Sequence, residues 1–196
     1  MVNYLQATQS ELNNFNNLFS KKDHKEALAE LDLLTQKYPN DPNLFLFGGN
    51  CYVEMGHFNQ AILCYEEAIK LNPDLVDAHN NMGICLKEIG EIEKAVISFK
   101  NALKLKPDYA MAHNNLGICL YDLSQSKEAQ LCYKRAIKLK PDYAEPHSNL
   151  GNILKDLGNV DEAILSYQKA IKLNPDFIDA YNNLGNVLKD LNHLND

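Results

Sequence analysis

Apolar residues fall in short stretches with helical spacing along the chain, and polar residues fill the positions between them. In the stretch 76–88, Met82 and Leu86 stand about one helical turn apart. In the stretch 92–105, the apolar positions follow i, i+4, i+7 and i+8, which is one face of a helix: Ala95, Phe99, Ala102 and Leu103. The two stretches predict a pair of helices.

The same pattern returns every 34 residues. Five prolines mark this period: Pro39, Pro73, Pro107, Pro141 and Pro175. A fixed period in this range is typical of repeat proteins. With the proline at position 32, the chain divides into five repeats and a half repeat: 8–41, 42–75, 76–109, 110–143, 144–177 and 178–196. We therefore predict a single solenoid over residues 1–196, whose last repeat stops where its second helix is due.

Residues at the ends of the predicted helices suggest how the turns form. Gly56, Gly90 and Gly158 follow the first helix of their repeats, where a residue with left-handed backbone is common. An aspartate follows the proline in four repeats and is predicted to cap the next helix: Asp74, Asp108, Asp142 and Asp176.

Small and large residues alternate at fixed positions of each repeat. Positions 8, 20 and 27 are small, positions 7, 11 and 24 are large, and position 32 is proline; in the third repeat these are Gly83, Ala95, Ala102, Met82, Leu86, Phe99 and Pro107. This pattern resembles the tetratricopeptide repeat (TPR) family. The resemblance implies an all-α fold, a right-handed superhelix built as a solenoid of antiparallel helix pairs. The first repeat has Phe15 where glycine is usual, so we expect a divergent N-terminal cap.

Asparagine recurs on the first predicted helix of successive repeats. Position 6 holds four of them, which we call the asparagine ladder: Asn81, Asn115, Asn149 and Asn183. Positions 5 and 9 hold six more: Asn50, Asn80, Asn114, Asn152, Asn182 and Asn186. On a helical wheel these positions lie away from the apolar positions 7, 8 and 11. Asparagine inside a helix costs up to about 0.7 kcal/mol relative to alanine, so its repetition favours a role in binding.

In the TPR family this face of the first helix lines a concave groove, and the resemblance implies that the asparagines bind peptide there. The repeats are most like those of O-GlcNAc transferase-type superhelical TPR domains, in which groove asparagines hold substrate backbone without much sequence preference. A neutral amide offers both a donor and an acceptor, which suits an extended peptide backbone. Acidic residues at position 13 favour a neutral or basic peptide: Glu54, Glu88, Asp122, Asp156 and Asp190.

Charge and composition argue against several other classes of function. A net charge of −7 disfavours binding to nucleic acid. The N-terminal residues lack the features of a secretory signal, and no apolar run reaches the roughly 20 residues of a membrane span. We therefore expect no membrane partner and a cytoplasmic location. Motifs for nucleotide, metalloprotease and hydrolase sites are missing from the sequence, so we expect no enzyme activity and no cofactor.

Histidine recurs at position 4 as His79, His113 and His147. Equivalent positions in stacked helices lie roughly 10 Å apart. Neighbours at that distance are too far apart to share a zinc ion, whose bonds to histidine are about 2.1 Å long. We expect no metal site and interpret these histidines as packing residues between helices.

Three functions remain open at this point. The leading one is a protein- or peptide-binding scaffold that holds extended backbone in its groove. The second is the substrate-recognition arm of a larger glycosyltransferase resembling O-GlcNAc transferase, with its catalytic domain beyond Asp196. The third is a structural spacer whose ends bind other proteins. The last predicted helix, 178–191, carries an apolar stripe, which indicates either a longer protein or a homo-oligomer formed through this helix: Tyr181, Leu184 and Leu188.

Overall fold

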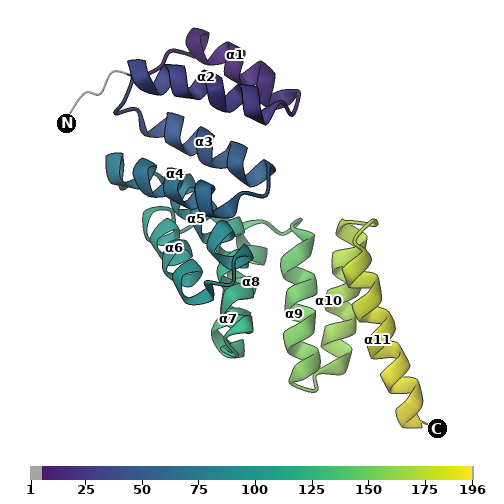
Figure 1. Cartoon of the computed structure of the whole chain (residues 1–196). Helices are drawn as coiled ribbons and strands as arrows, with labels where there is room; N and C mark the ends of the chain where they lie inside the picture. Colours follow the sequence, from purple (N-terminus) through teal and green to yellow (C-terminus); the bar gives the residue numbers. More distant parts are fainter. Residues whose placement is uncertain (1–5, 196) are drawn as a thin grey trace. The chain divides into compact units, whose positions relative to one another are not determined.

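A computed structural model describes residues 6–195 of the chain, and the side chains of residues 6–191. The described residues form eleven helices and no strand (Figure 1). None of the helices in this described part is both long enough and apolar enough to cross a lipid bilayer. The chain divides into two compact units, which we call the N-terminal unit (residues 1–106) and the C-terminal unit (residues 107–196).

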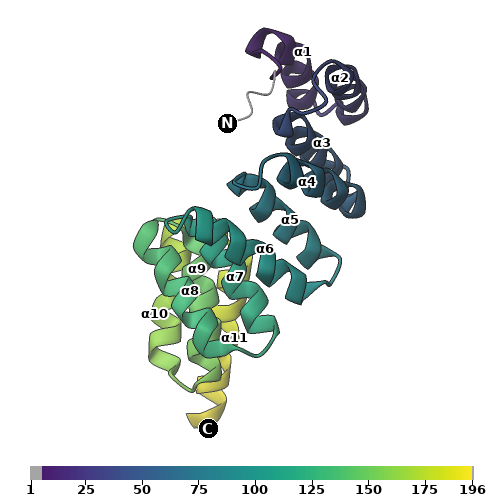
Figure 2. The same ribbon diagram turned by 90° about the vertical axis from the view of Figure 1, so that its left-hand side faces the viewer.

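Each unit is a stack of antiparallel helix pairs. The N-terminal unit contains α1 (Gln9–Ser20), α2 (His24–Lys37), α3 (Pro42–Glu54), α4 (Phe58–Leu71), α5 (Val76–Glu88) and α6 (Ile92–Leu105). The C-terminal unit contains α7 (Ala110–Asp122), α8 (Ser126–Leu139), α9 (Ala144–Asp156), α10 (Val160–Leu173) and α11 (Ile178–Asn195). Within a unit, the second helix of one pair also packs on the first helix of the next, as Figure 2 shows from a second direction.

The helix boundaries follow the repeat predicted from the sequence. The predicted stretches 76–88 and 92–105 coincide with α5 and α6. From residue 42 to residue 177, each repeat places its two helices at the same two positions. The predicted fold class, an all-α solenoid of antiparallel helix pairs, is confirmed, and a single domain over 1–196 stays a prediction.

A glycine of the first helix packs against an aromatic ring of the second helix in four repeats. A Cβ atom built on Gly83 would lie only 2.7 Å from the ring of Phe99. The same close approach recurs in the other three: Gly49 with Tyr65, Gly117 with Tyr133, and Gly151 with Tyr167. All four rings are buried. A missing side chain therefore lets the two helices of a pair approach closely, and this contact explains the small and large positions of the repeat.

The turns inside the helix pairs use left-handed backbone, as predicted. Gly56, Gly90 and Gly158 have φ values of 73°, 83° and 77°. Lys22 and Ser124 occupy the equivalent turns with φ values of 62° and 60°. A residue with a Cβ atom pays a steric cost in this conformation, which glycine avoids.

The predicted aspartate caps are wrong. The N-cap residues of α5, α7 and α9 are Leu75, Tyr109 and Tyr143, and none of them caps its helix through its side chain. The aspartate lies one residue earlier, inside the turn, where the N–H of Asp74 donates to Oδ1 of Asn72 at 3.1 Å. A capping side chain must directly precede the first helical residue to reach the open N–H groups, and the offset prevents this.

The first helix pair differs from the others in its core. Phe15 is buried where later repeats have glycine, and its ring stacks on Phe47 at a centroid distance of 5.4 Å. Thr8 and Glu11 form a capping box at the start of α1. The N-terminal unit therefore begins with a helix whose core contact is the aromatic ring of Phe15 and whose first turn is capped by polar side chains.

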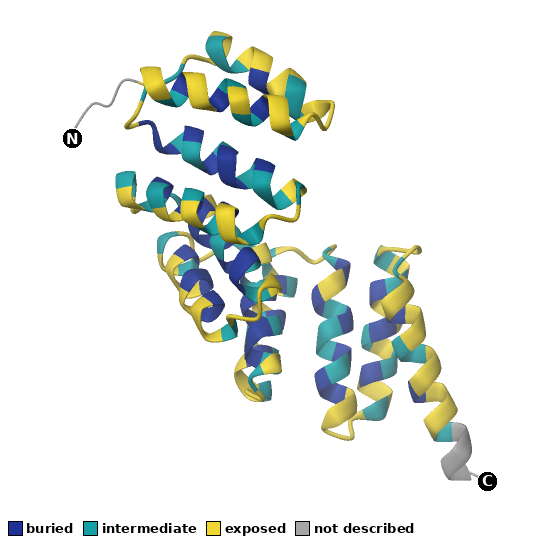
Figure 3. Cartoon of the chain, viewed as in Figure 1, coloured by how far each residue is buried: buried dark blue, intermediate teal, exposed yellow. Residues whose placement is uncertain are grey.

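Within the described residues, α11 is not followed by a second helix. A Cβ atom built on Gly185 would meet nothing within 4 Å, unlike the glycines at the same position of the four complete repeats from residue 42 to residue 177. Tyr181 and Leu188 are exposed as expected, and Figure 3 shows α11 largely exposed over its described length. Leu184 packs instead against the core around Tyr167, so the expectation that it belongs to an exposed stripe is wrong.

Candidate functional site

The asparagine ladder lies on the first helices of successive pairs. Its four members are half-buried: Asn81 on α5, Asn115 on α7, Asn149 on α9 and Asn183 on α11. A half-buried amide still reaches the surface, where a ligand can contact it. The two units hold their ladder amides differently.

In the N-terminal unit, three asparagines form a chain of side-chain hydrogen bonds. Nδ2 of Asn81 donates to Oδ1 of Asn50 at 3.0 Å, which joins α5 to α3. Nδ2 of Asn80 donates to Oδ1 of Asn81 at 3.1 Å. These bonds fix the orientation of the Asn81 amide. Because an amide oxygen has two lone pairs, Asn81 retains one acceptor position for a further partner.

An open pocket of about 310 Å³ lies beside this chain of amides. Its lining comes from α1, α3 and α5, the first helices of three successive pairs: Phe19, Asn50, Val53, Glu54, Asn81 and Ile84. Apolar walls with a few polar groups are typical of ligand sites, because the walls supply contact area and the polar groups set orientation.

In the C-terminal unit, one of the three ladder amides is hydrogen-bonded to another described side chain. Nδ2 of Asn149 donates to Oδ1 of Asn114 at 3.1 Å, which joins α9 to α7. Within this unit, the side chains of Asn115 and Asn183 make no hydrogen bond with another described residue. Both amides are therefore available to a ligand.

Two of the predicted site residues are buried. Asn80 is 1% exposed and Asn114 is 3% exposed. Their burial contradicts the expectation that they contact a peptide directly. They instead hydrogen-bond to Asn81 and Asn149, and so orient the half-buried members of the ladder. The exposed asparagines of the predicted set are Asn182 and Asn186, on α11.

The asparagines at position 9 have a partner in the core that the sequence analysis missed. The hydroxyl of Tyr65 donates to Oδ1 of Asn50 at 2.8 Å. The hydroxyl of Tyr167 donates to Oδ1 of Asn152 at the same distance. Burial raises the pKa of Tyr167 to about 12, so its hydroxyl stays a donor at neutral pH. Asn50 and Asn152 therefore satisfy buried hydroxyl groups, and each keeps its Nδ2 for other partners.

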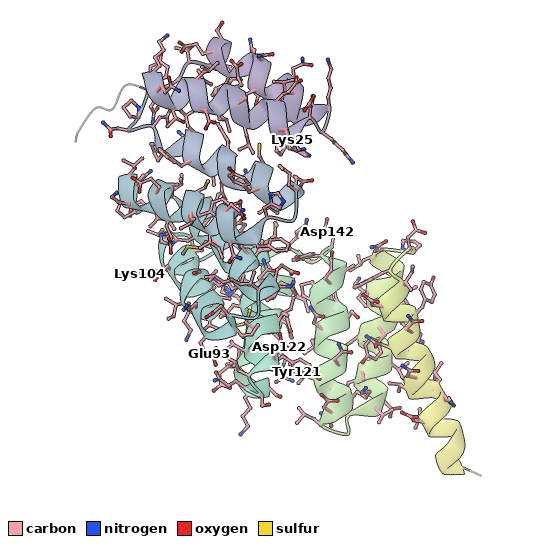
Figure 4. All side chains as sticks on the ribbon, in the orientation of Figure 1. Lys25, Glu93, Lys104, Tyr121, Asp122 and Asp142 are labelled. Carbon is pink, nitrogen blue, oxygen red and sulfur yellow. The ribbon has the colours of Figure 1, made fainter. Side chains whose placement is uncertain are left out.

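A second contact on the first helices involves the acidic residues of position 13. In the C-terminal unit, the hydroxyl of Tyr121 on α7 donates to Oδ2 of Asp156 on α9 at 2.5 Å. This bond is the main cause that raises the pKa of Tyr121 to about 12. Figure 4 labels Tyr121 and Asp122 near the C-terminal end of α7. Asp156 thus has a structural partner, whereas Glu54 lines the pocket of the N-terminal unit.

The recurring histidines bind the turn that precedes their own helix. Nε2 of His79 lies 2.9 Å from the carbonyl oxygen of Pro73, and Nε2 of His113 lies 3.0 Å from that of Pro107. His147 makes a longer contact of the same kind. In the described part of the chain, no three His, Cys, Asp or Glu side chains lie close enough together to hold a metal ion. The histidines join helix and turn, a role that the period alone did not indicate.

Comparison with known proteins agrees with the repeat pattern. A family model described as "TPR repeat" matches residues 49–90, 85–124, 119–158 and 151–192. A search of curated proteins gave no match.

Solved structures with similar folds cover most of the chain. MamA from residue 41 to its end, from Desulfovibrio magneticus RS-1, has a TM-score of 0.77 and 20% identity, over 86% of this chain and 96% of that one. YrrB, described as a TPR protein with an unusual peptide-binding site, has a TM-score of 0.73 and 22% identity, over 90% and 91%. TTC0263, a thermophilic TPR protein in Thermus thermophilus, has a TM-score of 0.69 and 23% identity, over 93% and 99%. At these identities the likeness shows the fold alone.

Proposed function

The chain belongs to the TPR repeat family, and on that premise we propose that it is a non-enzymatic scaffold that binds extended segments of partner proteins. The binding face is the one formed by the first helices, where the asparagine ladder lies. The ligand is recognised mainly through its backbone. YrrB, which shares the fold, is described as having a peptide-binding site, and a peptide ligand on this fold agrees with that description.

The observation that carries this proposal is the state of Asn115 and Asn183. Both are half-buried inside helices, and neither makes a side-chain hydrogen bond to the described residues of its unit. Asparagine lowers helix stability by up to about 0.7 kcal/mol relative to alanine. For these two residues, no side-chain hydrogen bond to a described residue of the unit offsets that loss. A ligand that bonds to both groups of each amide accounts for their presence.

An extended peptide backbone is the ligand class that these amides fit best. Each residue of such a backbone presents one N–H and one C=O. An asparagine side chain presents the complementary pair, so it recognises backbone without selecting side chains. The apolar walls supplied by Phe19, Val53 and Ile84 add contact area in the N-terminal unit.

Charges on the same face favour neutral or basic peptides. Glu54 lines the pocket of the N-terminal unit, and Asp122 is exposed near the end of α7. An acidic peptide would be repelled there, since like charges close together disfavour binding. We therefore expect lysine- or arginine-containing ligands to bind more tightly than acidic ones.

The expected affinity is modest. Each neutral hydrogen bond contributes a net ~0.5–1.5 kcal/mol, so four ladder amides give about 2–6 kcal/mol before the cost of ordering the peptide. This corresponds to micromolar or weaker dissociation constants. Tighter capture requires several contact sites on one partner.

Two other functions predicted from the sequence remain alternatives. The recognition arm of a glycosyltransferase would use the same asparagines and differ by a catalytic domain beyond residue 196. A structural spacer would bind through its ends, and the exposed Tyr181 and Leu188 on α11 fit a homo-oligomer of that kind. The spacer predicts that the ladder has no effect on binding, which separates it from our proposal.

The direct test is binding to an unbiased peptide array by the wild type and by an Asn115→Ala/Asn183→Ala variant. We expect the wild type to bind many unrelated peptides weakly and the variant to lose them together. The same variant should unfold at a slightly higher temperature, because alanine is the better helix former. Asn101→Ala on the second helix α6 serves as the control, since it changes an exposed asparagine on another face.

Reduced binding together with raised stability separates a lost binding site from a damaged fold. If both proteins bind the same peptides equally, or if neither binds any, the ladder is not the ligand site. A mass of two or more chains in solution, lost on Tyr181→Ser/Leu188→Ser, would then support the spacer.

A further inference from the structure

From the third repeat on, the acid at position 13 follows a residue that can donate a hydrogen bond. Position 12 holds a lysine or a tyrosine in these repeats: Lys87, Tyr121, Lys155 and Lys189. Nζ of Lys87 lies 2.8 Å from the carboxylate of Glu88, its neighbour on α5. The hydroxyl of Tyr121 on α7 donates to Asp156 on α9, the next first helix. An acid at position 13 can therefore be reached from position 12 of its own helix or of the preceding first helix.

Glu54 has neither of these partners. Position 12 is Val53 on its own helix, α3, and Phe19 on the preceding first helix, α1. Neither side chain can donate a hydrogen bond. Within the described residues, the carboxylate of Glu54 forms no ion pair and no hydrogen bond. The cations of the turn after α1 and of the start of α2 make no ion pair there either: Lys21, Lys22 and Lys25.

The same three side chains line the 310 Å³ pocket of the N-terminal unit, together with Ile84 and two of the asparagines. The ring of Phe19 is fixed by its neighbours, since it lies 5.7 Å from the ring of Phe15 and meets the ring of His24 edge-on at 5.2 Å. A wall that is already ordered binds a ligand with a smaller loss of conformational freedom. The pocket thus combines a preformed apolar wall with one carboxylate that lacks an internal partner.

We propose that this pocket binds one lysine or arginine side chain of the peptide ligand. The alkyl stem of that side chain lies against Phe19, Val53 and Ile84, and its cation pairs with Glu54. Long cationic side chains commonly bury their stem while the charged end stays near water. The side chain of the ligand supplies the cation that position 12 supplies in the third repeat, where Lys87 pairs with its neighbouring glutamate.

The inference rests on the proposed function, because the peptide must bind to the face formed by the first helices. It goes further in assigning one anchor residue of the peptide to one pocket. Backbone recognition alone allows a peptide to bind in any register, since every residue presents the same N–H and C=O. A pocket that accepts one type of side chain sets a single register.

Two amides on the same pocket can hold the backbone of the anchor residue. Asn50 keeps its Nδ2 group as a donor, because its recorded hydrogen bonds are both accepted by Oδ1. Asn81 keeps one acceptor position on its amide oxygen. A donor and an acceptor side by side match one N–H and one C=O of an extended backbone. The anchor residue is thus recognised through both its backbone and its side chain.

Other side chains fit this pocket less well. A neutral apolar side chain would cover part of the Glu54 carboxylate and offer it no hydrogen bond, which costs free energy. An acidic side chain would be repelled by the same carboxylate. Lysine and arginine combine a long alkyl stem with a charged group that only donates hydrogen bonds, so they match the walls and the carboxylate together.

The experiment uses an array of N-acetylated peptides that is probed with the intact chain. Acetylation removes the terminal amine, so any cation is a side chain. We expect the bound peptides to share a lysine or arginine at one position. One of them is then compared, by fluorescence anisotropy, with copies that carry norleucine or alanine there. Norleucine keeps the stem without the charge and should bind about threefold more weakly, whereas alanine should bind about tenfold more weakly.

Variants of the pocket assign this preference to Glu54. Glu54→Gln should remove the difference between the lysine and norleucine peptides, and a double-mutant cycle measures that coupling. Val53→Lys copies the pair of Lys87 and Glu88 and should weaken the lysine peptide at least threefold. The matched control is Glu93→Gln, which removes an exposed carboxylate from α6 in the same unit and should leave the difference intact (Figure 4). Because Glu54 and Glu93 are both exposed, neither glutamine variant should change the melting temperature appreciably.

The outcomes separate this inference from the proposed function. Peptides that bind without a shared cation, or that share a leucine or phenylalanine instead, would overturn the anchor pocket and leave backbone recognition standing. A lysine preference that survives in Glu54→Gln would do the same. If Asn115→Ala/Asn183→Ala binds every peptide normally while Glu54→Gln loses the lysine preference, the pocket is supported and the role of the ladder is wrong. If the wild type binds no peptide, both proposals fail.

Discussion

The third and fifth repeats build the same helix pair with different side chains at one contact. In the third repeat, Ile84 at position 9 accompanies the buried ring of Phe99 at position 24. In the fifth, Asn152 accompanies Tyr167 and accepts a hydrogen bond from its hydroxyl at 2.8 Å. In the fifth repeat, asparagine at position 9 thus supplies the acceptor for the buried tyrosine hydroxyl at position 24. In the fourth repeat, Ile118 accompanies Tyr133, so the pairing is favourable without being obligatory.

This comparison divides the asparagines into two groups. Those at position 9, such as Asn152, are explained by the core. Asn115 and Asn183 at position 6 make no side-chain hydrogen bond to another described residue, and the core does not explain them. The distinction directs the search for a ligand site to position 6 and makes the packing contacts testable separately.

The largest expected effect concerns the glycine contact that both repeats share. Gly83→Ala and Gly151→Ala would each place a Cβ atom within 2.7 Å of a buried ring. Because ring and helix are tightly packed, we expect the free energy of unfolding to fall by about 2 kcal/mol in each variant. Denaturant titration of each variant measures this.

Gly185→Ala is the matched control for those two variants. A Cβ atom at Gly185 meets nothing within 4 Å, so the only change is a better helix former. We expect a stabilisation of α11 of up to about 1 kcal/mol. If all three variants were destabilised alike, the ring contact would not be the cause.

The next prediction converts the third repeat into the fifth. Phe99→Tyr places a hydroxyl beside Ile84, whose side chain cannot accept a hydrogen bond, and should lower the free energy of unfolding by about 1 kcal/mol. Adding Ile84→Asn should recover part of this loss. A double-mutant cycle measures the coupling between the two substitutions. A coupling free energy of zero would show that position 9 and position 24 are independent.

A smaller effect is expected in the turns. Gly90 and Gly158 supply the left-handed residue in the third and fifth repeats, whereas the fourth repeat uses Ser124 at φ 60°. Ser124→Gly should raise the free energy of unfolding by about 0.5–1 kcal/mol, because it relieves a steric cost. Gly158→Ser should lower it by a similar amount, as measured by thermal unfolding. A change of the same sign in both variants would argue against backbone strain.

The smallest effect is expected from removing the hydroxyl of Tyr167 in the fifth repeat. Tyr167→Phe deletes the hydrogen bond to Asn152, but Asn152 is only half-buried and can bind water instead. We expect a loss of about 0.5 kcal/mol in the free energy of unfolding. The same measurement on Asn152→Ala should give a larger loss, since the buried hydroxyl would then lack its acceptor.

Much of the fold was predictable because the repeat fixes it. The period places both helices of every repeat from residue 42 to residue 177, and Gly56, Gly90 and Gly158 end the first helices as expected. The aspartate caps failed because the composition of a turn does not determine which of its residues directly precedes the helix. A shift of one residue, from Leu75 to Asp74, is enough to remove the cap.

The site was predictable only in part, because burial depends on packing between helices. A helical wheel places positions 5, 6 and 9 on one polar face, yet Asn80 and Asn114 are buried. The bond between Tyr167 and Asn152 joins two helices and needs their relative placement, although the joint change at positions 9 and 24 was a visible signal. The position of an asparagine in the repeat indicates the side of the helix on which it lies. Only the structure shows whether its amide is buried or already hydrogen-bonded to another side chain.

The central claim is that position 6 recognises peptide backbone, and one titration tests it most directly. A peptide selected on the array is compared with copies of itself that carry single backbone N-methyl groups, on the wild type and on Asn115→Ala/Asn183→Ala. The claim predicts that methylation at some residue weakens binding to the wild type by about tenfold and has little further effect on the variant. Equal losses in both proteins, or no loss in either, would contradict it.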